Sequence, residues 1–154
     1  RAEGELQAAV ELIEGFGQYG KTVLGLNLKE AGILYRVLYG EDPGNMDFLQ
    51  LGPKIKEKLA VNLLCLHSAR LAAAFEGDAI HVQKCLTIKT PKLLTGCGDN
   101  FNAGLSLGLL MALPLDDCLS AGICTAAYYI ENGYSATVEQ LIAYMLQKGD
   151  GAFE

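Results

Sequence analysis

The sequence predicts an α/β fold in one globular domain or part of one, and three observations support this. Stretches with the apolar spacing of amphipathic helices alternate with short apolar runs that are typical of buried strands. The 154 residues suit one domain, and 51% of them are hydrophobic whereas 19% are charged, which is a globular composition. The chain has no internal repeat or low-complexity segment, so one layered domain, or part of one, is the simplest interpretation.

The first part of the chain predicts a helix, a strand and two more helices. From Glu5 to Phe16 the apolar residues form one helical stripe, which the following glycines end. The run KTVLGLN, residues 21–27, has the length of a buried strand. Helical spacing resumes over residues 28–40, EDPGN is expected to form a loop, and another helix is expected from Asp47 to Leu59.

The middle of the chain changes to the pattern of strands. The runs VNLLCLH, RLAAAF and AIHVQ are short and apolar, and the turn sequence Glu76-Gly77-Asp78 predicts a hairpin between the last two. From Asp99 onward helical spacing returns and is broken by Pro114. Two further helices are expected, over residues 117–130 and 137–147.

Composition restricts the partners and the compartment. A net charge of −6, without a cluster of Lys and Arg, argues against nucleic acid as a partner. The five cysteines form an odd set without a C-x-x-C pair, which favours a reducing cytoplasm over a disulfide framework or a zinc site. No apolar run is long enough to cross a membrane. Because the chain begins with Arg1 and enters a helical pattern at once, we expect a fragment whose earlier residues are missing.

The segment TGCGDNF, residues 95–101, carries the clearest chemical signal. Phe101 occupies the place of the third glycine of a dinucleotide fingerprint, and no Gly-Lys-Ser/Thr follows as in a P-loop. What remains is a glycine turn that leads into a helix. Such a turn offers unbonded backbone N–H groups and the positive end of the helix dipole to an anion.

Asp99 has two interpretations. As a general base beside this anion site, its carboxylate would accept the proton of a hydroxyl while the backbone N–H groups stabilise a phosphoryl group in transfer. As the simpler alternative, Asp99 caps the helix and the glycines only make the turn. The next helix presents Ala121, Gly122 and Thr125 to Gly104 and Gly108, so close packing of the two helices is expected to hold the turn rigidly.

The segment Thr95–Gly104 resembles the T-G-A-G-D-x-F-x-A-G signature of the ribokinase-like (PfkB) carbohydrate kinases. It differs mainly in having Cys97 where the family has a small Ala. The resemblance implies a three-layer α/β/α fold, of which this chain is the C-terminal portion. It also implies that Asp99 is the catalytic base and that the backbone of Gly96, Cys97 and Gly98 forms the anion hole.

A second match is Asn27-Leu28-Lys29-Glu30, which is similar to the family's N-x-x-E. The resemblance implies that Asn27 and Glu30 help to hold Mg²⁺ and phosphates, and the predicted strand-to-helix junction is where ligands bind in such folds. An ordinary helix cap at the strand exit is the alternative.

The segment LLCLHSARLAAAF stands in the place of the family's nucleotide-phosphate loop, T-L-G-x-x-G. By resemblance His67, Ser68 and Arg70, together with Gly98, would contact ATP. His67 and Arg70 replace glycines, so Arg70 either hinders the approach of ATP or supplies a charged phosphate contact, and a solvated loop is the alternative. Leu93 stands where many members carry an Asp that binds a monovalent cation, and Thr125 belongs to the helix that borders the family's adenine pocket.

The resemblance therefore implies an ATP- and Mg²⁺-dependent kinase of a sugar hydroxyl, located in the cytoplasm. The N-terminal half, with the lid, most sugar contacts and a lid-mediated homodimer, lies outside residues 1–154, so we expect these residues alone to be inactive. Two alternatives stay open. One is a kinase of a vitamin precursor or nucleoside with the same fold, and the other is a non-catalytic family member that binds a nucleotide or a partner.

Overall fold

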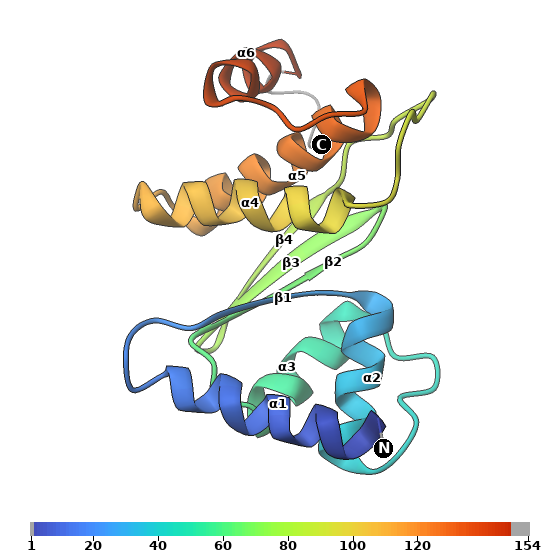
Figure 1. The fold of residues 1–154 in the computed structure, drawn as a ribbon, viewed down its shortest axis with the longest axis vertical. Coiled ribbons are helices and arrows are strands. Elements are labelled where there is room, and N and C mark those ends of the chain that lie inside the picture. Colours follow the sequence, from blue (N-terminus) through green and yellow to red (C-terminus); the bar gives the residue numbers. More distant parts are fainter. Residues whose placement is uncertain (1, 149–154) are drawn as a thin grey trace. The chain divides into compact units, whose positions relative to one another are not determined.

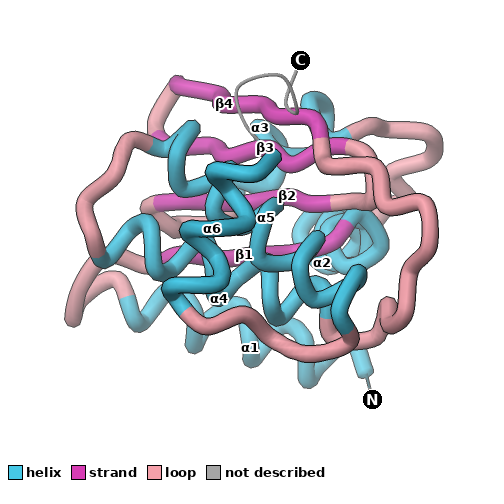
Figure 2. Tube along the Cα trace, turned by 90° about the horizontal axis from the view of Figure 1, so that it is seen from above, coloured by secondary structure: helices cyan, strands magenta, loops and turns pink. Residues whose placement is uncertain are grey.

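The structure is a computed structural model that describes residues 2–148, and it confirms the predicted α/β class (Figure 1). The strands lie in the order β1-β2-β3-β4, as Figure 2 shows. The elements along the chain are α1 (Ala2–Phe16), β1 (Val23–Asn27), α2 (Leu28–Tyr39), α3 (Phe48–Lys58), β2 (Leu63–His67), β3 (Leu71–Glu76), β4 (Ala79–Lys84), α4 (Cys97–Leu110), α5 (Leu115–Asn132) and α6 (Val138–Lys148).

Two helices begin two residues earlier than the sequence predicts. Helix α4 begins at Cys97 because Gly96, with φ 91° and ψ 1°, is its N-cap. Helix α5 begins at Leu115 because Pro114 is its N-cap. Proline has no backbone N–H, so it ends the preceding pattern and still fits at the start of a new helix. The predicted hairpin is confirmed, with Gly77 at φ 55° in the turn between β3 and β4.

The chain forms two compact units. The first comprises Arg1–His67 and Ala73–Ile80, and the second comprises Ser68–Ala72 and His81–Glu154. The division therefore passes through β3 and β4. Each unit has a hydrophobic core of its own.

In the first unit, β1 and β2 run parallel and place Asn27 opposite His67. The side chains of β2 are buried from Leu63 to Leu66, as expected for a parallel strand inside a sheet. Helices α2 and α3 contribute fully buried side chains to the same core, among them Tyr35 and Ile55.

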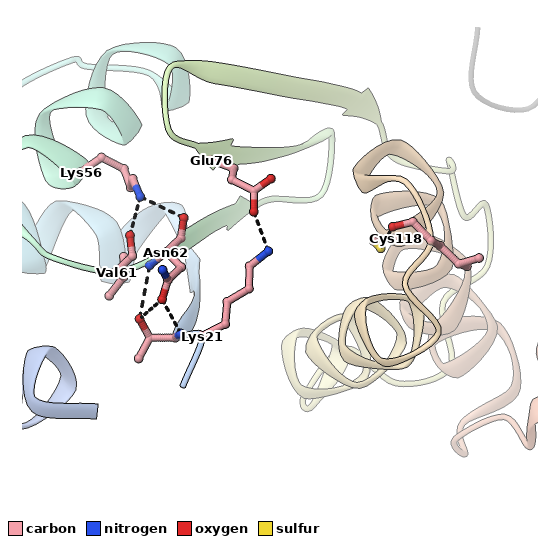
Figure 3. A network of polar contacts seen from close by, with 8 residues as sticks. Lys21, Lys56, Val61, Asn62, Glu76 and Cys118 are labelled. Carbon is pink, nitrogen blue, oxygen red and sulfur yellow. Dashed lines mark hydrogen bonds and ion pairs between the residues drawn. The ribbon is translucent and has the colours of Figure 1, made fainter. Parts of the chain in front are cut away.

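Side-chain hydrogen bonds fix the amino-terminal ends of β1 and β2 (Figure 3). The side-chain oxygen of Asn62 accepts hydrogen bonds from the backbone N–H (2.7 Å) and the hydroxyl (3.1 Å) of Thr22. Lys56 donates to the carbonyl oxygens of Val61 and Asn62, and Lys21 pairs with Glu76 at 2.6 Å. These contacts set the register at the end of the strands opposite to Asn27 and His67.

In the second unit, α4 and α5 pack at very short distance. A Cβ atom built at Gly104 would lie 2.5 Å from the carbonyl oxygen of Ala121, and one at Gly108 would lie 2.9 Å from the Cα of Cys118. The predicted close packing is confirmed. Helix α6 closes the core through Leu141 and Tyr144. Among the helices within residues 2–148, none has both the length and the apolar character that a membrane crossing requires.

Candidate active site

The glycine turn leads directly into α4, as the sequence predicts. The amide of Cys97 donates to the carbonyl of Leu94 (3.2 Å), so this N–H is used inside the turn and is not offered to an anion. By contrast, the amides of Gly96, Gly98 and Asp99 form no hydrogen bond within residues 2–148. The donors available to an anion at the positive end of the helix dipole are therefore those on either side of Cys97.

Helix α5 holds the turn in place. The hydroxyl of Tyr129 donates to the carbonyl of Thr95 (2.8 Å), and the amide of Lys92 donates to the carbonyl of Ile130 (2.8 Å). A Cβ atom at position 96 would lie 3.1 Å from the Tyr129 hydroxyl, in a backbone conformation that favours glycine. The turn thus depends on Gly96 and Tyr129 together.

Asn100 supports the same turn from within α4. Its backbone N–H and its side-chain Nδ2 both donate to the carbonyl of Gly96, at 3.1 and 2.9 Å, and the residue is buried. The sequence patterns indicated no role for Asn100 or Tyr129. The contact of Asn100 follows helical spacing and was open to prediction, whereas that of Tyr129 joins residues 34 positions apart and has no local signal.

Asp99 is exposed and lies in the first turn of α4. Its carboxylate forms no hydrogen bond or ion pair with any residue in the described range 2–148. The alternative that Asp99 caps the helix is wrong, because the N-cap is Gly96 and no side chain caps this helix. An exposed carboxylate beside unbonded amides has the geometry to receive a proton from a bound hydroxyl.

Asn27 and Glu30 form a capping box at the start of α2. The side-chain oxygen of Asn27 accepts from the Glu30 amide (2.9 Å), and Glu30 Oε2 accepts from the Asn27 amide (2.9 Å). The structure therefore shows the cap that was the alternative to a metal site. A single exposed carboxylate can still contact Mg²⁺, which usually keeps several waters. Within residues 2–148, no three His, Cys, Asp or Glu side chains gather as an all-protein metal site.

His67 ends β2 opposite Asn27, so the carboxyl ends of the parallel strands bring Asn27, Glu30 and His67 together in the first unit. Burial lowers the pKa of His67, and the charge of Glu30 partly opposes this. Without a bound anion, the imidazole is therefore mainly neutral near pH 7.

Ser68 and Arg70 lie in the second unit, in the short turn before β3. The hydroxyl of Ser68 accepts from the amides of Arg70 (3.1 Å) and Leu71 (3.1 Å) and donates to the carbonyl of Leu71 (3.1 Å). This hydroxyl is engaged within the turn, whereas the Arg70 side chain is exposed. Of the two predicted nucleotide-contacting residues in this turn, Arg70 offers an exposed cation, whereas the Ser68 hydroxyl stabilises the turn itself.

A small cavity of about 100 Å³ in the second unit involves the predicted adenine-bordering helix. Thr125 of α5 lines it together with Gly104 and Leu107 of α4 and Thr137 before α6. The Thr125 hydroxyl is already bonded to the carbonyl of Ala121 at 2.7 Å. Gly122 packs against Phe101 of α4.

Many solved structures share this fold. Among them are a ribokinase from Thermotoga maritima (TM-score 0.72, 19% identity, 86% of this chain and 44% of that one), an adenosine kinase from Sinorhizobium meliloti (0.71, 18%, 94% and 40%) and an Arabidopsis thaliana ribokinase complexed with ribose and ATP (0.67, 18%, 80% and 40%). The chain spans less than half the length of each. These likenesses confirm the ribokinase-like fold.

The sequence itself matches a family model. No curated protein matches the chain. The model of the prokaryotic ketohexokinases, however, matches residues 1–148, which is nearly the entire chain. The chain therefore belongs to the prokaryotic ketohexokinase family.

Proposed function

We propose that this chain is the C-terminal portion of an ATP-dependent kinase that phosphorylates a hydroxyl of a sugar, with a ketohexose as the first candidate. The observation that carries the proposal is the exposed carboxylate of Asp99 at the start of α4, beside the unbonded amides of Gly96 and Gly98. The family supports a kinase, and its description supports a ketohexose. The base and the anion hole would then belong to one turn of the chain, against which the acceptor hydroxyl of the sugar would lie.

The proposed step is an in-line displacement. The sugar oxygen forms a bond to the γ-phosphorus of ATP while the bond from that phosphorus to the bridging β,γ-oxygen breaks and ADP leaves. Asp99 takes the proton of the attacking hydroxyl, and the amides of Gly96, Gly98 and Asp99 stabilise the negative charge on the transferred group. Because Cys97 donates to Leu94, its amide is left out of this anion hole.

ATP and Mg²⁺ are the expected cofactors. The Arabidopsis ribokinase complexed with ribose and ATP supports the nucleotide. In this chain Arg70 is the candidate for a charged phosphate contact, since the Ser68 hydroxyl is engaged in its own turn. The exposed carboxylate of Glu30 and the nearby His67 would meet hydrated Mg²⁺ or the phosphates, and the ion would neutralise phosphate charge.

The proposal includes a part of the protein outside residues 1–154 and a location in the cell. This chain covers only 44% and 40% of the ribokinase and the adenosine kinase, which supports a further half of the protein that carries the lid, most sugar contacts and a homodimer interface. A cytoplasmic location agrees with the cysteines, since none of the five, all within residues 2–148, forms a disulfide. Nucleic acid and membranes are not proposed as partners.

The substitution Asp99→Asn tests the mechanism in the whole protein. Loss of a general base lowers kcat by roughly 10²- to 10⁴-fold, while the KM for ATP stays close to that of the wild type. Turnover is to be measured with ATP and Mg²⁺ on a panel of ketohexoses, ribose and adenosine. Adenosine represents the nucleoside alternative, which the adenosine kinase fold supports.

Asp117→Asn is the matched control. Asp117 is also exposed and also lies in the first turn of its helix, α5, but no glycine turn precedes it. It therefore reproduces the loss of a negative charge at a helix N-terminus without the loss of a base. Equal turnover of Asp99→Asn and wild type would refute the general base. Nucleotide affinity without turnover in the wild type would instead favour a non-catalytic binding protein.

A further inference from the structure

One buried polar atom of the second unit has no hydrogen-bond partner within residues 2–148. It is the side-chain oxygen Oδ1 of Asn102 in α4. Buried acceptors are nearly always bonded, because an unbonded one loses its water and gains nothing in return. Such an exception calls for a donor that the described residues do not supply, and functional sites are where exceptions of this kind are expected.

The position of Asn102 in α4 indicates where that donor would lie. Asn102 follows Asp99 by three residues, so the Cβ atoms of the two are neighbours about 5–6 Å apart on the helix surface. Asn100, the other asparagine of this helix, differs because its side chain is bonded to the carbonyl of Gly96. The two asparagines thus differ, since Asn100 holds the turn, whereas the side-chain oxygen of Asn102, three residues after the candidate base, is buried without a partner in residues 2–148.

We propose that Asn102 is a specificity-determining residue whose Oδ1 accepts a hydrogen bond from a second hydroxyl of the acceptor substrate. This inference rests on the proposed function. A sugar presents hydroxyls on adjacent carbons, so a vicinal diol with one hydroxyl at Asp99 can offer the next to Asn102. The contact requires that the Asn102 side chain turns its oxygen, which is buried in the unliganded chain, toward the bound sugar. A carboxamide oxygen accepts a hydrogen bond without taking the proton, which leaves deprotonation to Asp99. The pair therefore selects polyhydroxy acceptors over simple alcohols.

Asn102→Leu in the whole protein tests this contact, because leucine is similar in size and cannot accept a hydrogen bond. With the ketohexose that the wild type uses best, the KM for the sugar is expected to rise roughly three- to tenfold. The KM for ATP is expected to stay the same. For the deoxy sugar that lacks the contacted hydroxyl, wild type and variant should show equal KM values, which a purely structural role would not produce.

Ser106→Ala is the matched control, since Ser106 is exposed on the same helix one turn further along. Its kinetic constants should equal those of the wild type. The thermal midpoint of the unliganded Asn102→Leu protein should be equal to or higher than that of the wild type, because the variant removes an unbonded buried acceptor. If this variant fails to unfold cooperatively, Asn102→Ala replaces it, with the same expected rise in the KM for the sugar.

Three outcomes would overturn the contact. An unchanged KM for the sugar in an active Asn102→Leu enzyme refutes the hydrogen bond between Asn102 and the sugar and leaves the proposed function intact. An unchanged KM with a lowered midpoint shows that an ordered water alone satisfies Asn102. A wild-type protein that phosphorylates nothing on the panel refutes the proposed function and the contact with it.

Discussion

At the end of α4, Ala112 has a backbone conformation that favours glycine, with φ 55°. The amide of Leu113 donates to the carbonyl of Gly108 (3.1 Å) and that of Ala112 to the carbonyl of Leu109 (3.0 Å). These are the two bonds of a Schellman motif, whose left-handed residue is usually glycine because a Cβ atom is strained there. Ala112 therefore costs the helix end some stability.

We expect Ala112→Gly to raise the free energy of unfolding by about 0.5–1 kcal/mol, despite the greater backbone freedom of glycine in the unfolded chain. Urea denaturation of the whole protein measures this change. Ala143→Gly is the control, since Ala143 is exposed inside α6, and it should lower the same free energy by about 1 kcal/mol. A loss of stability in both variants would show that Ala112 is not strained.

At the same scale, the sequence predicted the residues of the candidate site better than their hydrogen bonds. The order of Gly96, Gly98 and Asp99 was enough to predict a glycine turn with an exposed acid. It was not enough to predict that the Cys97 amide is taken by Leu94, since that depends on the path of the loop before the turn. For Asn27 and Glu30 the spacing was compatible with a cap as well as a ligand pair, and the structure shows the cap.

At the scale of elements, the contact between α4 and α5 fixes the direction of the helix that carries Asp99. Gly104 faces the backbone of Ala121 and the hydroxyl of Thr125, so no side chain fits at this position. Because both obstacles belong to the neighbouring helix, and one of them is backbone, the helices have to move apart to admit a methyl group. Such a movement would also displace the hydroxyl of Tyr129 from Thr95.

Gly104→Ala is therefore expected to lower the free energy of unfolding by about 1–3 kcal/mol, as overpacking usually does. The same variant should lower kcat as well, since the first turn of α4 is displaced. Thermal unfolding and turnover of the whole protein measure the two effects. Gly15→Ala in α1 is the control, because no atom lies within 4 Å of a Cβ built there, and it should leave both values unchanged or raise stability. A fully stable Gly104→Ala variant would contradict the close contact.

The helices and strands themselves were largely predictable, because their apolar periodicity is strong. Every predicted strand and helix is present, and the errors lie at their ends, since β1 and β2 begin two residues later than predicted and α4 and α5 two residues earlier. Helix α5 illustrates the reason, since Pro114 does separate two helices and is also the N-cap of the second. A proline both ends and begins helices, and only the residues packed on either side decide which effect dominates.

For the whole molecule, the strand order β1-β2-β3-β4 bears on how well the sheet is covered. Strand β1 lies at one end of this order. Four of its residues are half-buried and Val23 is exposed, in contrast to the four buried residues of β2. Parallel strands are normally covered on both sides. The solved neighbours, of which this chain spans less than half, have further chain that could supply such a cover.

We therefore expect purified residues 1–154 to show no phosphorylation of the ketohexose panel under conditions in which the whole protein is active. The candidate base and anion hole lie within these residues, but most sugar contacts are proposed for a part of the protein outside them, so the acceptor hydroxyl would not be held near Asp99. Cooperative thermal unfolding must first establish that the shorter chain is folded. Sugar phosphorylation by residues 1–154 that disappears in Asp99→Asn would contradict the expectation, because a contaminating kinase would not respond to that substitution. Such a result would mean that these residues contain the complete site.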